Sequence, residues 1–295
     1  MDIAKKIDNS TYTFIGFEPA WGKGSWGATS IICISDDGLN WRTVAKLPQL
    51  GGLRDHSVTR YKDSFYIVGT LAIYRTKDFS HFEQLAAPFY NNNLDSKWAP
   101  DLFQDKFGGY HVVLTATRKH ADMGEGHRMV FIFDLDLDKG VFTNQWQRVA
   151  IDCGNDIDAS IQYFQGKYYC FMSHGHVYVS DHYWGPYTHC NTNLPETFNG
   201  KIGYEEGPQV LMTNDRPLLF TDKLHTDPSK GWNQSYVVRR SVDGLTKWSD
   251  EQELICDAGQ TQMRHGSFLY RGQPPVLQDY FPDVVSNSSL GTKVS

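Results

Sequence analysis

Three acidic residues and a histidine recur at corresponding points of a repeated pattern in the sequence. Asp55 stands two residues before a serine and 11 residues before a tyrosine, and Asp158 repeats both spacings. Weaker copies of the pattern place Ala99, Glu206 and His265 at the same point. Carboxylates and imidazoles gathered in one cavity are costly to desolvate unless they are paired, bind a ligand or react. These positions are therefore the candidate site.

Three carboxylates around one cavity indicate cleavage of a glycosidic bond. One carboxyl group must keep its proton in order to donate it to the leaving oxygen, and another must be ionised to activate water or to attack. A third raises the pKa of the acid through repulsion between like charges. The alternative is that the aspartates are turn-forming residues at exposed loop ends, and their shared place in the repeat argues against it.

The spacing of the copies indicates the elements that carry them. From Asp55 the successive steps are 44, 59, 48 and 59 residues, and each suits a four-stranded antiparallel sheet, which is one blade of a β-propeller. Little chain follows the fifth copy, but residues 12–17 resemble residues 65–70, the second strand of the first copy. Residues 12–47 are therefore expected to supply strands two to four of the last blade around a C-terminal inner strand, which closes the ring.

We thus predict an all-β fold, a single five-bladed β-propeller catalytic domain over residues 1–295 with a polar tail at 281–295. The composition agrees, because aromatic residues make up 14% of the chain and clusters of Gly, Asn and Asp punctuate it. No long segment has the 3.6-residue period of an amphipathic helix.

The charge and cysteine content narrow the partners and the compartment. A net charge of −6 without charge blocks argues against nucleic acid or an anionic membrane as the partner. The N-terminus lacks a signal-peptide core, and no apolar run is long enough to span a bilayer. The five cysteines are scattered without a CxxC pair, so we expect reduced, mostly packed thiols in a cytoplasmic protein. The oligomeric state does not follow from the sequence.

Further side chains are expected to reach the same cavity and to bind substrate. Arg54, Trp98 and Arg264 directly precede three of the axial positions. His174 and Asp222 lie at the far ends of second strands, which run back to the same mouth. Trp98 has two interpretations, stacking on a sugar ring or packing between blades.

Other residues near these positions are given lesser roles. Asp156 is a weaker candidate than its neighbour two residues on, because it lacks the 11-residue spacing to a tyrosine. Asp101 aligns with the serine of the pattern, so we expect it to make structural hydrogen bonds between blades. The glycine-containing loops 22–27 and 119–127 are expected to wall the pocket, and the histidines of the second loop are a weak zinc signal.

In order along the chain, the motifs resemble those of glycoside hydrolase family 43. They are Arg54-Asp-His-Ser, Trp98-Ala-Pro-Asp, Asp158-Ala-Ser followed by Gly-Lys-Tyr-Tyr, Glu206-Gly-Pro and Arg264-His-Gly-Ser. The resemblance covers roughly residues 50–270. It implies a five-bladed propeller that acts as an arabinofuranosidase, xylosidase or arabinanase. We therefore predict release of α-L-arabinofuranose or β-D-xylose from oligosaccharides.

The resemblance also implies roles for the axial residues. Asp55 would be the general base, Asp158 the residue that modulates pKa values and Glu206 the general acid, with inversion at the anomeric carbon. Glu205 is the rival of Glu206, but strand alternation sends the two to opposite faces and only Glu206 directly precedes Gly-Pro. His265 matches an axial histidine that sits beside a calcium ion in many members. No organic cofactor is expected.

One motif departs from the family pattern, which has proline on either side of the first aspartate. Here Arg54 and His56 flank Asp55, and the arginine favours an ionised carboxylate. The alternatives are a retaining fructan or sucrose hydrolase, a glycoside phosphorylase, or a non-catalytic propeller that binds a sugar or a protein. Inversion predicts a separation of about 6.5–9.5 Å between the carboxyl groups of Asp55 and Glu206.

Overall fold

The structure is a computed structural model of the chain. It describes residues 2–19, 28–70, 72–87, 94–118, 128–195, 204–225 and 233–272. The predicted tail at 281–295 and the predicted pocket loops at 22–27 and 119–127 lie outside these ranges.

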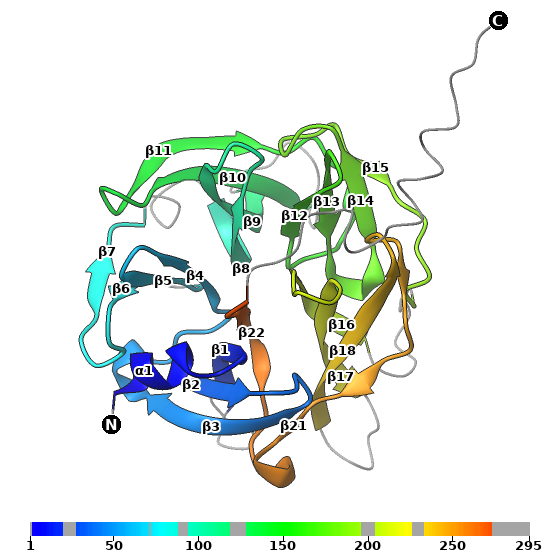
Figure 1. Cartoon of the computed structure of the whole chain (residues 1–295). Helices are drawn as coiled ribbons and strands as arrows, with labels where there is room; N and C mark the ends of the chain where they lie inside the picture. The colour runs from blue at the N-terminus through cyan, green and yellow to red at the C-terminus, as the bar shows by residue number, and fades with distance from the viewer. Residues whose placement is uncertain are drawn as a thin grey trace, which may run out of the picture.

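Five sheets, antiparallel except for the outermost strand of one, surround a central axis, so the predicted five-bladed β-propeller is confirmed (Figure 1). The first blade comprises β4 (Ser57–Tyr61), β5 (Ser64–Val68), β6 (Ile73–Thr76) and β7 (Glu83–Leu85). The second comprises β8 (Leu94–Gln104), β9 (Tyr110–Arg118), β10 (Met129–Asp136) and β11 (Val141–Arg148). The third comprises β12 (Ser160–Phe164), β13 (Lys167–Phe171), β14 (Val177–Ser180) and β15 (Thr188–His189). The fourth comprises β16 (Tyr204–Leu211), β17 (Leu218–His225), β18 (Asn233–Asp243), β19 (Lys247–Trp248) and β20 (Gln252–Glu253).

The fifth blade joins the two ends of the chain, as predicted. Its strands are, from the axis outward, β22 (Arg264–Tyr270), β1 (Tyr12–Pro19), β2 (Ala28–Ser35), β3 (Asn40–Leu47) and β21 (Ile255–Cys256). Tyr12 pairs with Tyr270 at one end of the β1–β22 ladder, and Figure 1 shows the blue and orange segments in one sheet. The parallel outer strand β21 was not anticipated. Helix α1 (Ile3–Asp8) and short 3₁₀ turns at Pro48–Leu50, Ser173–Gly175 and Asp257–Gly259 complete the described elements.

The core lies between the blades. Each pair of adjoining blades shares a hydrophobic cluster, for example Val68 and Phe133 between the first and second blades. The sheets therefore stabilise one another through their faces, because burial of each large side chain contributes about 1.5–3 kcal/mol. Four of the five cysteine thiols are buried and all five are free, in agreement with the prediction of packed, reduced thiols.

Hydrogen bonds near the axis hold neighbouring inner strands together. The Oγ of Ser57 accepts a bond from the backbone N–H of Leu102 at 2.7 Å, and the Oγ of Ser267 accepts one from Val58 at 2.8 Å. Ser57 also donates to Asp101 at 2.6 Å, so the expected structural role of this aspartate between blades is borne out by its contacts. These bonds fix the inner strands in register around the ring.

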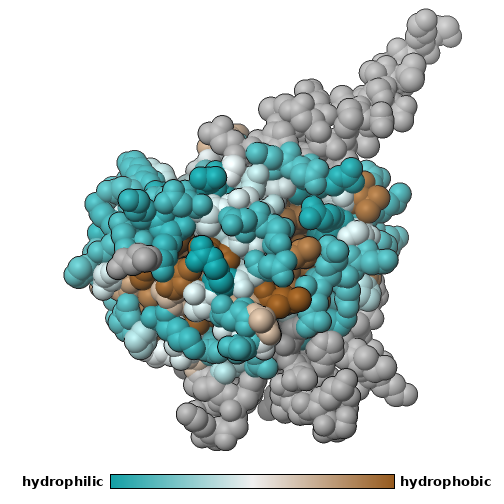
Figure 2. Space-filling view, turned by 60° about the horizontal axis from the view of Figure 1, so that its bottom comes forward, coloured by the Kyte–Doolittle hydropathy of each residue, from teal (hydrophilic) through white to brown (hydrophobic). Residues whose placement is uncertain are grey.

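The outer surface in view is mostly polar. Figure 2 shows that hydrophilic residues cover most of this face and that hydrophobic residues gather in small, separate patches. In the described part of the chain, no helix has the length and apolar character needed to cross a bilayer.

Candidate active site

The inner strands share an unusual backbone conformation at the axial end of each blade. At this point φ is positive in every blade, with values of 55° at Asp55, 33° at Ala99, 61° at Asp158, 54° at Gly207 and 24° at His265. Left-handed backbone is costly for residues with a Cβ, and such residues cluster at functional sites.

The repeat in the fourth blade is therefore displaced by one residue from the predicted alignment. The position equivalent to Asp55 is Gly207, and Glu206 precedes it. The alignment matched the acidic Glu206 to Asp55 by residue type, whereas the strand register places Gly207 there. A β-bulge follows Glu206, with three steps along β16 against two along β17, and β8 and β22 carry the same bulge. Glu206 pairs instead with Asp222, as Arg264 pairs with Phe17 before the corresponding bulge in β22.

His265 lies between two of the predicted catalytic aspartates. Its Nδ1 is 3.6 Å from Oδ1 of Asp55 and 3.8 Å from Oδ2 of Asp158. Thr70, which follows β5, donates a hydrogen bond of 2.5 Å to Oδ2 of Asp55. The backbone N–H of Gly207 donates to Oδ2 of Asp158 at 3.1 Å. The start of β4, the start of β12 and strand β22 thus bring Asp55, Asp158 and His265 together.

Glu206 faces the same region and is held by an arginine. Its Oε2 is 3.0 Å from Nη2 of Arg264, and its side chain is 13% exposed. Glu205 points to the other face of β16, where it forms a buried ion pair of 2.6 Å with Arg239. The structure therefore separates the two neighbouring glutamates as strand alternation predicted.

The surroundings drive the pKa values of these carboxyl groups apart. Burial alone would raise the pKa of Asp55, but the charge that His265 carries when it is protonated in acid, the charge of Arg54 and the Thr70 hydrogen bond lower it below its usual value. Burial raises the pKa of Glu206, against the opposing charge of Arg264. Two carboxyl groups whose surroundings push their pKa values in opposite directions are typical of acid–base sites.

The other two axial residues are also buried. Burial raises the pKa of Asp158 well above its usual value, and the negative charges of Glu206 and Asp55 add to this effect. Burial lowers the pKa of His265 to about 4. The imidazole is therefore neutral at neutral pH.

The predicted substrate-binding arginines both lie near the axial carboxylates. The guanidinium carbons of Arg54 and Arg264 lie 5.3 Å and 5.9 Å from the ring centroid of Phe17, which is 2% exposed. Sequence reasoning missed Phe17, because an apolar residue at the end of β1 looks like any other core position. Asp222 is 0% exposed and lies 3.4 Å from Nε of Arg264, so it is placed behind the arginine.

Trp98 and His174 have protein partners in the structure. The guanidinium of Arg128 lies 4.8 Å from the Trp98 ring centroid. His174 has a φ of 64°, and its Nδ1 is 3.0 Å from the buried Asp156, which also binds Nδ1 of His176 at 2.6 Å. Asp156 thus holds two imidazoles in place, a role that the sequence did not reveal. Both predictions of substrate contact stay predictions.

His56, the departure from the family pattern, is a packed residue. It is 2% exposed, its Nε2 lies 2.8 Å from the Ser30 hydroxyl oxygen, and it stacks on Phe17. Burial lowers its pKa to about 3. A neutral, buried histidine that packs against Ser30 and Phe17 therefore stands where the family pattern has proline.

The structure gives no independent support for the predicted calcium. In the described residues no three His, Cys, Asp or Glu side chains form a group that could hold a metal. The axial cavity beside His265, Asp158 and Asp101 has a volume of about 20 Å³, room for one water-sized species. Calcium takes six to eight oxygen ligands, so this donor set does not fit the ion without further ligands. No chemical step is assigned to a metal, and calcium at His265 stays a prediction.

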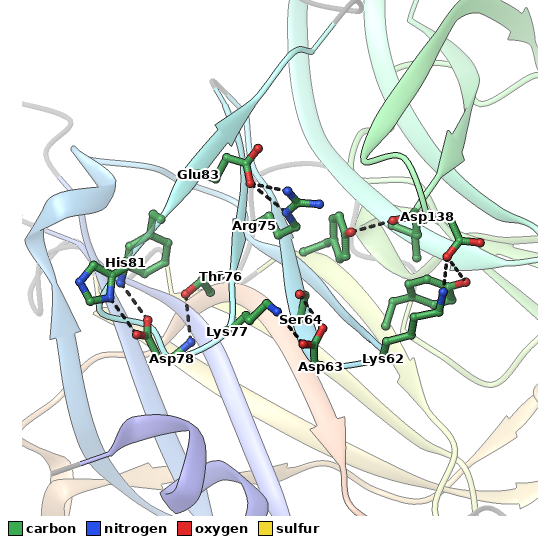
Figure 3. Close-up of a pocket in the computed structure, with 14 residues that line it drawn as sticks. Lys62, Asp63, Ser64, Arg75, Thr76, Lys77, Asp78, His81, Glu83 and Asp138 are labelled. Carbon is green, nitrogen blue, oxygen red and sulfur yellow. Dashed lines mark hydrogen bonds and ion pairs between the residues drawn. The ribbon is translucent and has the colours of Figure 1, made fainter.

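A larger cavity lies elsewhere. It has a volume of about 570 Å³ and is formed mainly by the β4–β5 and β6–β7 turns of the first blade (Figure 3). Its charged groups bind one another, as Lys77 does with Asp63 and Arg75 with Glu83. We place the site at the axis instead, because there buried carboxylates with divergent pKa values converge.

A propeller with three carboxyl groups and a histidine at one end of its axis is a class of fold and site found among glycoside-cleaving enzymes. The family model described as glycosyl hydrolases family 43 matches residues 49–276. The chain therefore belongs to this family, and the resemblance inferred from the motifs is confirmed.

Solved structures of the family share the fold at low sequence identity. The Cellvibrio cellulosa α-L-arabinanase in complex with arabinohexaose is 14% identical, with a TM-score of 0.56, and the match covers 82% of this chain and 92% of that one. A thermostable family-43 glycoside hydrolase is also 14% identical, with a TM-score of 0.57 and coverage of 89% and 96%. The BlXynB protein of Bacillus licheniformis is 16% identical, with a TM-score of 0.51 and coverage of 80% and 42%. This chain thus spans less than half the length of the BlXynB protein. No curated protein matches the sequence.

Proposed function

We propose that the protein is an inverting glycoside hydrolase that releases a pentose, α-L-arabinofuranose or β-D-xylose, from short oligosaccharides in the cytoplasm. The observation that carries the proposal is the contrast between Asp55, whose pKa is lowered, and Glu206, whose pKa is raised, at one end of the axis. Family membership supports a sugar substrate, and the arabinanase among the structural relatives favours arabinose.

In this mechanism Asp55 takes a proton from a water molecule that attacks the anomeric carbon. The Thr70 hydroxyl orients the carboxylate by donating to Oδ2. Glu206 gives its proton to the leaving oxygen as the glycosidic bond breaks. Asp158 is the proposed modulator of these pKa values, and its own pKa is raised well above its usual value by burial and by the negative charges of Glu206 and Asp55. The neutral His265 spaces the two aspartates without adding a charge at neutral pH.

A screen of aryl glycosides tests the substrate class. Arabinofuranoside, xyloside, galactoside and fructoside are compared, and we expect the fastest hydrolysis for one of the two pentosides. Proton NMR of the first-formed sugar should show inversion. Retention would contradict the role of Asp55 as a base and would favour a fructan- or sucrose-cleaving type of chemistry, whereas dependence of turnover on phosphate would indicate a phosphorylase.

Variants of the two central carboxylates test whether the protein is an enzyme at this site. We expect Asp55→Ala and Glu206→Ala to lower kcat/KM by at least about 10²–10⁴-fold while the circular dichroism spectrum is unchanged. Full activity of both folded variants on the preferred substrate would refute the mechanism. Sugar binding without turnover in the unmodified protein would indicate a binding propeller.

A further inference from the structure

Asp222 is a buried carboxyl group that the mechanism above does not use. It lies in β17 directly across the ladder from Glu206, and its side chain is 0% exposed. Among the described residues, neither of its oxygens has a hydrogen bond of ordinary geometry; its ion pair is with Nε of Arg264 at 3.4 Å, and a weaker hydrogen bond from the backbone N–H of His265 lowers its pKa. A buried carboxyl group with so little hydrogen bonding is costly, so a functional reason for its presence is expected.

Arg264 connects this buried group to the proposed acid. Its Nε faces Asp222 at 3.4 Å while its Nη2 reaches Glu206 at 3.0 Å. The two contacts use different nitrogens of one rigid, planar guanidinium group. The position of Nη2, and with it the position of the Glu206 carboxyl group, is therefore tied to the buried carboxyl group on the neighbouring strand.

The bulge in β16 begins directly after Glu206. Glu206 is the last regularly paired residue before the ladder between β16 and β17 shifts at Gln209, so regular pairing does not continue on that side of it. The Glu206 side chain faces further charged or titratable groups from several elements, so its place is set by a balance of charges. These groups are Arg54, Asp55, Asp158 and His174.

We propose that Asp222 is a positioning residue that acts through Arg264 to hold the Glu206 carboxyl group where it can reach the leaving oxygen. The inference rests on the proposed function, in which Glu206 is the acid. Asp222 itself touches no substrate in this arrangement. Asp222 holds the Arg264 guanidinium through Nε and offsets part of its positive charge. Arg264 can then orient Glu206 without forming a full ion pair with Glu206. The pKa of Asp222, raised to about 7 by burial, is consistent with a group whose charge is shared with this pair.

Leaving-group dependence tests the proposal, because it reports on the acid and not on folding. Hydrolysis of two aryl glycosides of the preferred sugar is measured in the unmodified protein and in Asp222→Asn. The 2,4-dinitrophenyl group leaves without a proton from an acid, whereas the phenyl group needs one. We expect kcat/KM for the phenyl glycoside to fall by about 10–100-fold, with less than about 3-fold loss for the dinitrophenyl glycoside and little change in KM. Arg264→Lys should show the same pattern, because an ammonium group cannot make both contacts.

Glu205→Gln is the matched control. This substitution also removes the charge of a buried, ion-paired carboxylate. Glu205 lies in the same strand as Glu206, but its side chain is on the opposite face. It should reduce stability and leave the leaving-group dependence unchanged.

Equal losses on both substrates in Asp222→Asn and Arg264→Lys, or no loss on either, would overturn the proposal while the glycosidase function stood. If Asp222→Asn does not fold, Arg264→Lys alone decides. Absence of hydrolysis by the unmodified protein on every glycoside would instead overturn the proposed function, and this inference with it.

Discussion

The Thr70→Val substitution removes one well-defined interaction from the proposed base. Thr70 donates a hydrogen bond of 2.5 Å to Oδ2 of Asp55, and valine has nearly the same shape without the hydroxyl. Hydrogen bonds to charged groups contribute about 1.5–3 kcal/mol. The Asp55 side chain is 14% exposed, so water partly replaces the lost donor and the lower end of this range applies. A loss of about 1.4 kcal/mol corresponds to a rise of about 1 unit in the pKa of Asp55.

The pH dependence of kcat/KM measures this rise. Asp55 must be ionised to act as a base, so activity is lost as the pH falls through its pKa. In Thr70→Val the acidic limb should move about 1 unit to higher pH, while the basic limb, set by Glu206, stays in place. An acidic limb that does not move in a folded, active variant would refute the assignment of Asp55.

Stability gives a second, activity-independent measurement of the same interaction. The pKa of Asp55 is lowered in the folded protein, so its ionised form stabilises the fold above the unfolded-state pKa, and this contribution is lost as the pH falls through the folded-state pKa. Thr70→Val should therefore lower the free energy of unfolding by about 1.5 kcal/mol at neutral pH and by less in acid. Thr221→Val is the matched control, because its hydroxyl donates to the buried Glu205 at 2.7 Å. It should cost stability without moving the acidic limb.

Two further substitutions test the frame of the site. Gly207→Ala would place a Cβ 2.9 Å from the His265 ring in left-handed backbone, so we expect a loss of at least about 1–2 kcal/mol in unfolding free energy together with reduced kcat/KM. An Ala variant as stable and active as the unmodified protein would contradict the bulge geometry. Arg239→Met leaves Glu205 buried without its ion-pair partner. It should lower the free energy of unfolding in urea by about 3–5 kcal/mol and leave kcat/KM for the preferred glycoside unchanged. A loss below about 1 kcal/mol would show that water or another residue compensates for the arginine.

The sequence predicted the blades well because hairpin register repeats in the sequence. The 11-residue spacing from Asp55 and from Asp158 to a tyrosine reflects a regular ladder between the first two strands, as in Ser57 opposite Val68 and Ser160 opposite Phe171. The same regularity made the closing blade recognisable from the likeness of residues 12–17 to residues 65–70.

The same reasoning failed by one residue in the fourth blade, because it matched an acidic side chain to Asp55 although the register places Gly207 there. A glycine followed by proline was the available signal, since Gly207 accepts a positive φ without strain. The contacts of Arg264 with Glu206 and Asp222 left no comparable signal. These contacts join β22 to β16 and β17, which lie far from β22 in the sequence. A fixed spacing between residues therefore cannot predict them.

The displaced alignment bears on the stereochemistry. Asp55 and Asp158 occupy the left-handed position itself, whereas Glu206 stands one residue before it and starts about 3.3 Å further along its strand. The proposed acid therefore leaves the backbone at a different level from the proposed base, and Arg264 contacts both it and Asp222. An offset of this kind suits a site that must fit a water molecule between base and sugar, as inversion requires. A crystal structure with bound sugar should show the carboxyl groups of Asp55 and Glu206 about 6.5–9.5 Å apart, and a separation near 5 Å would contradict inversion.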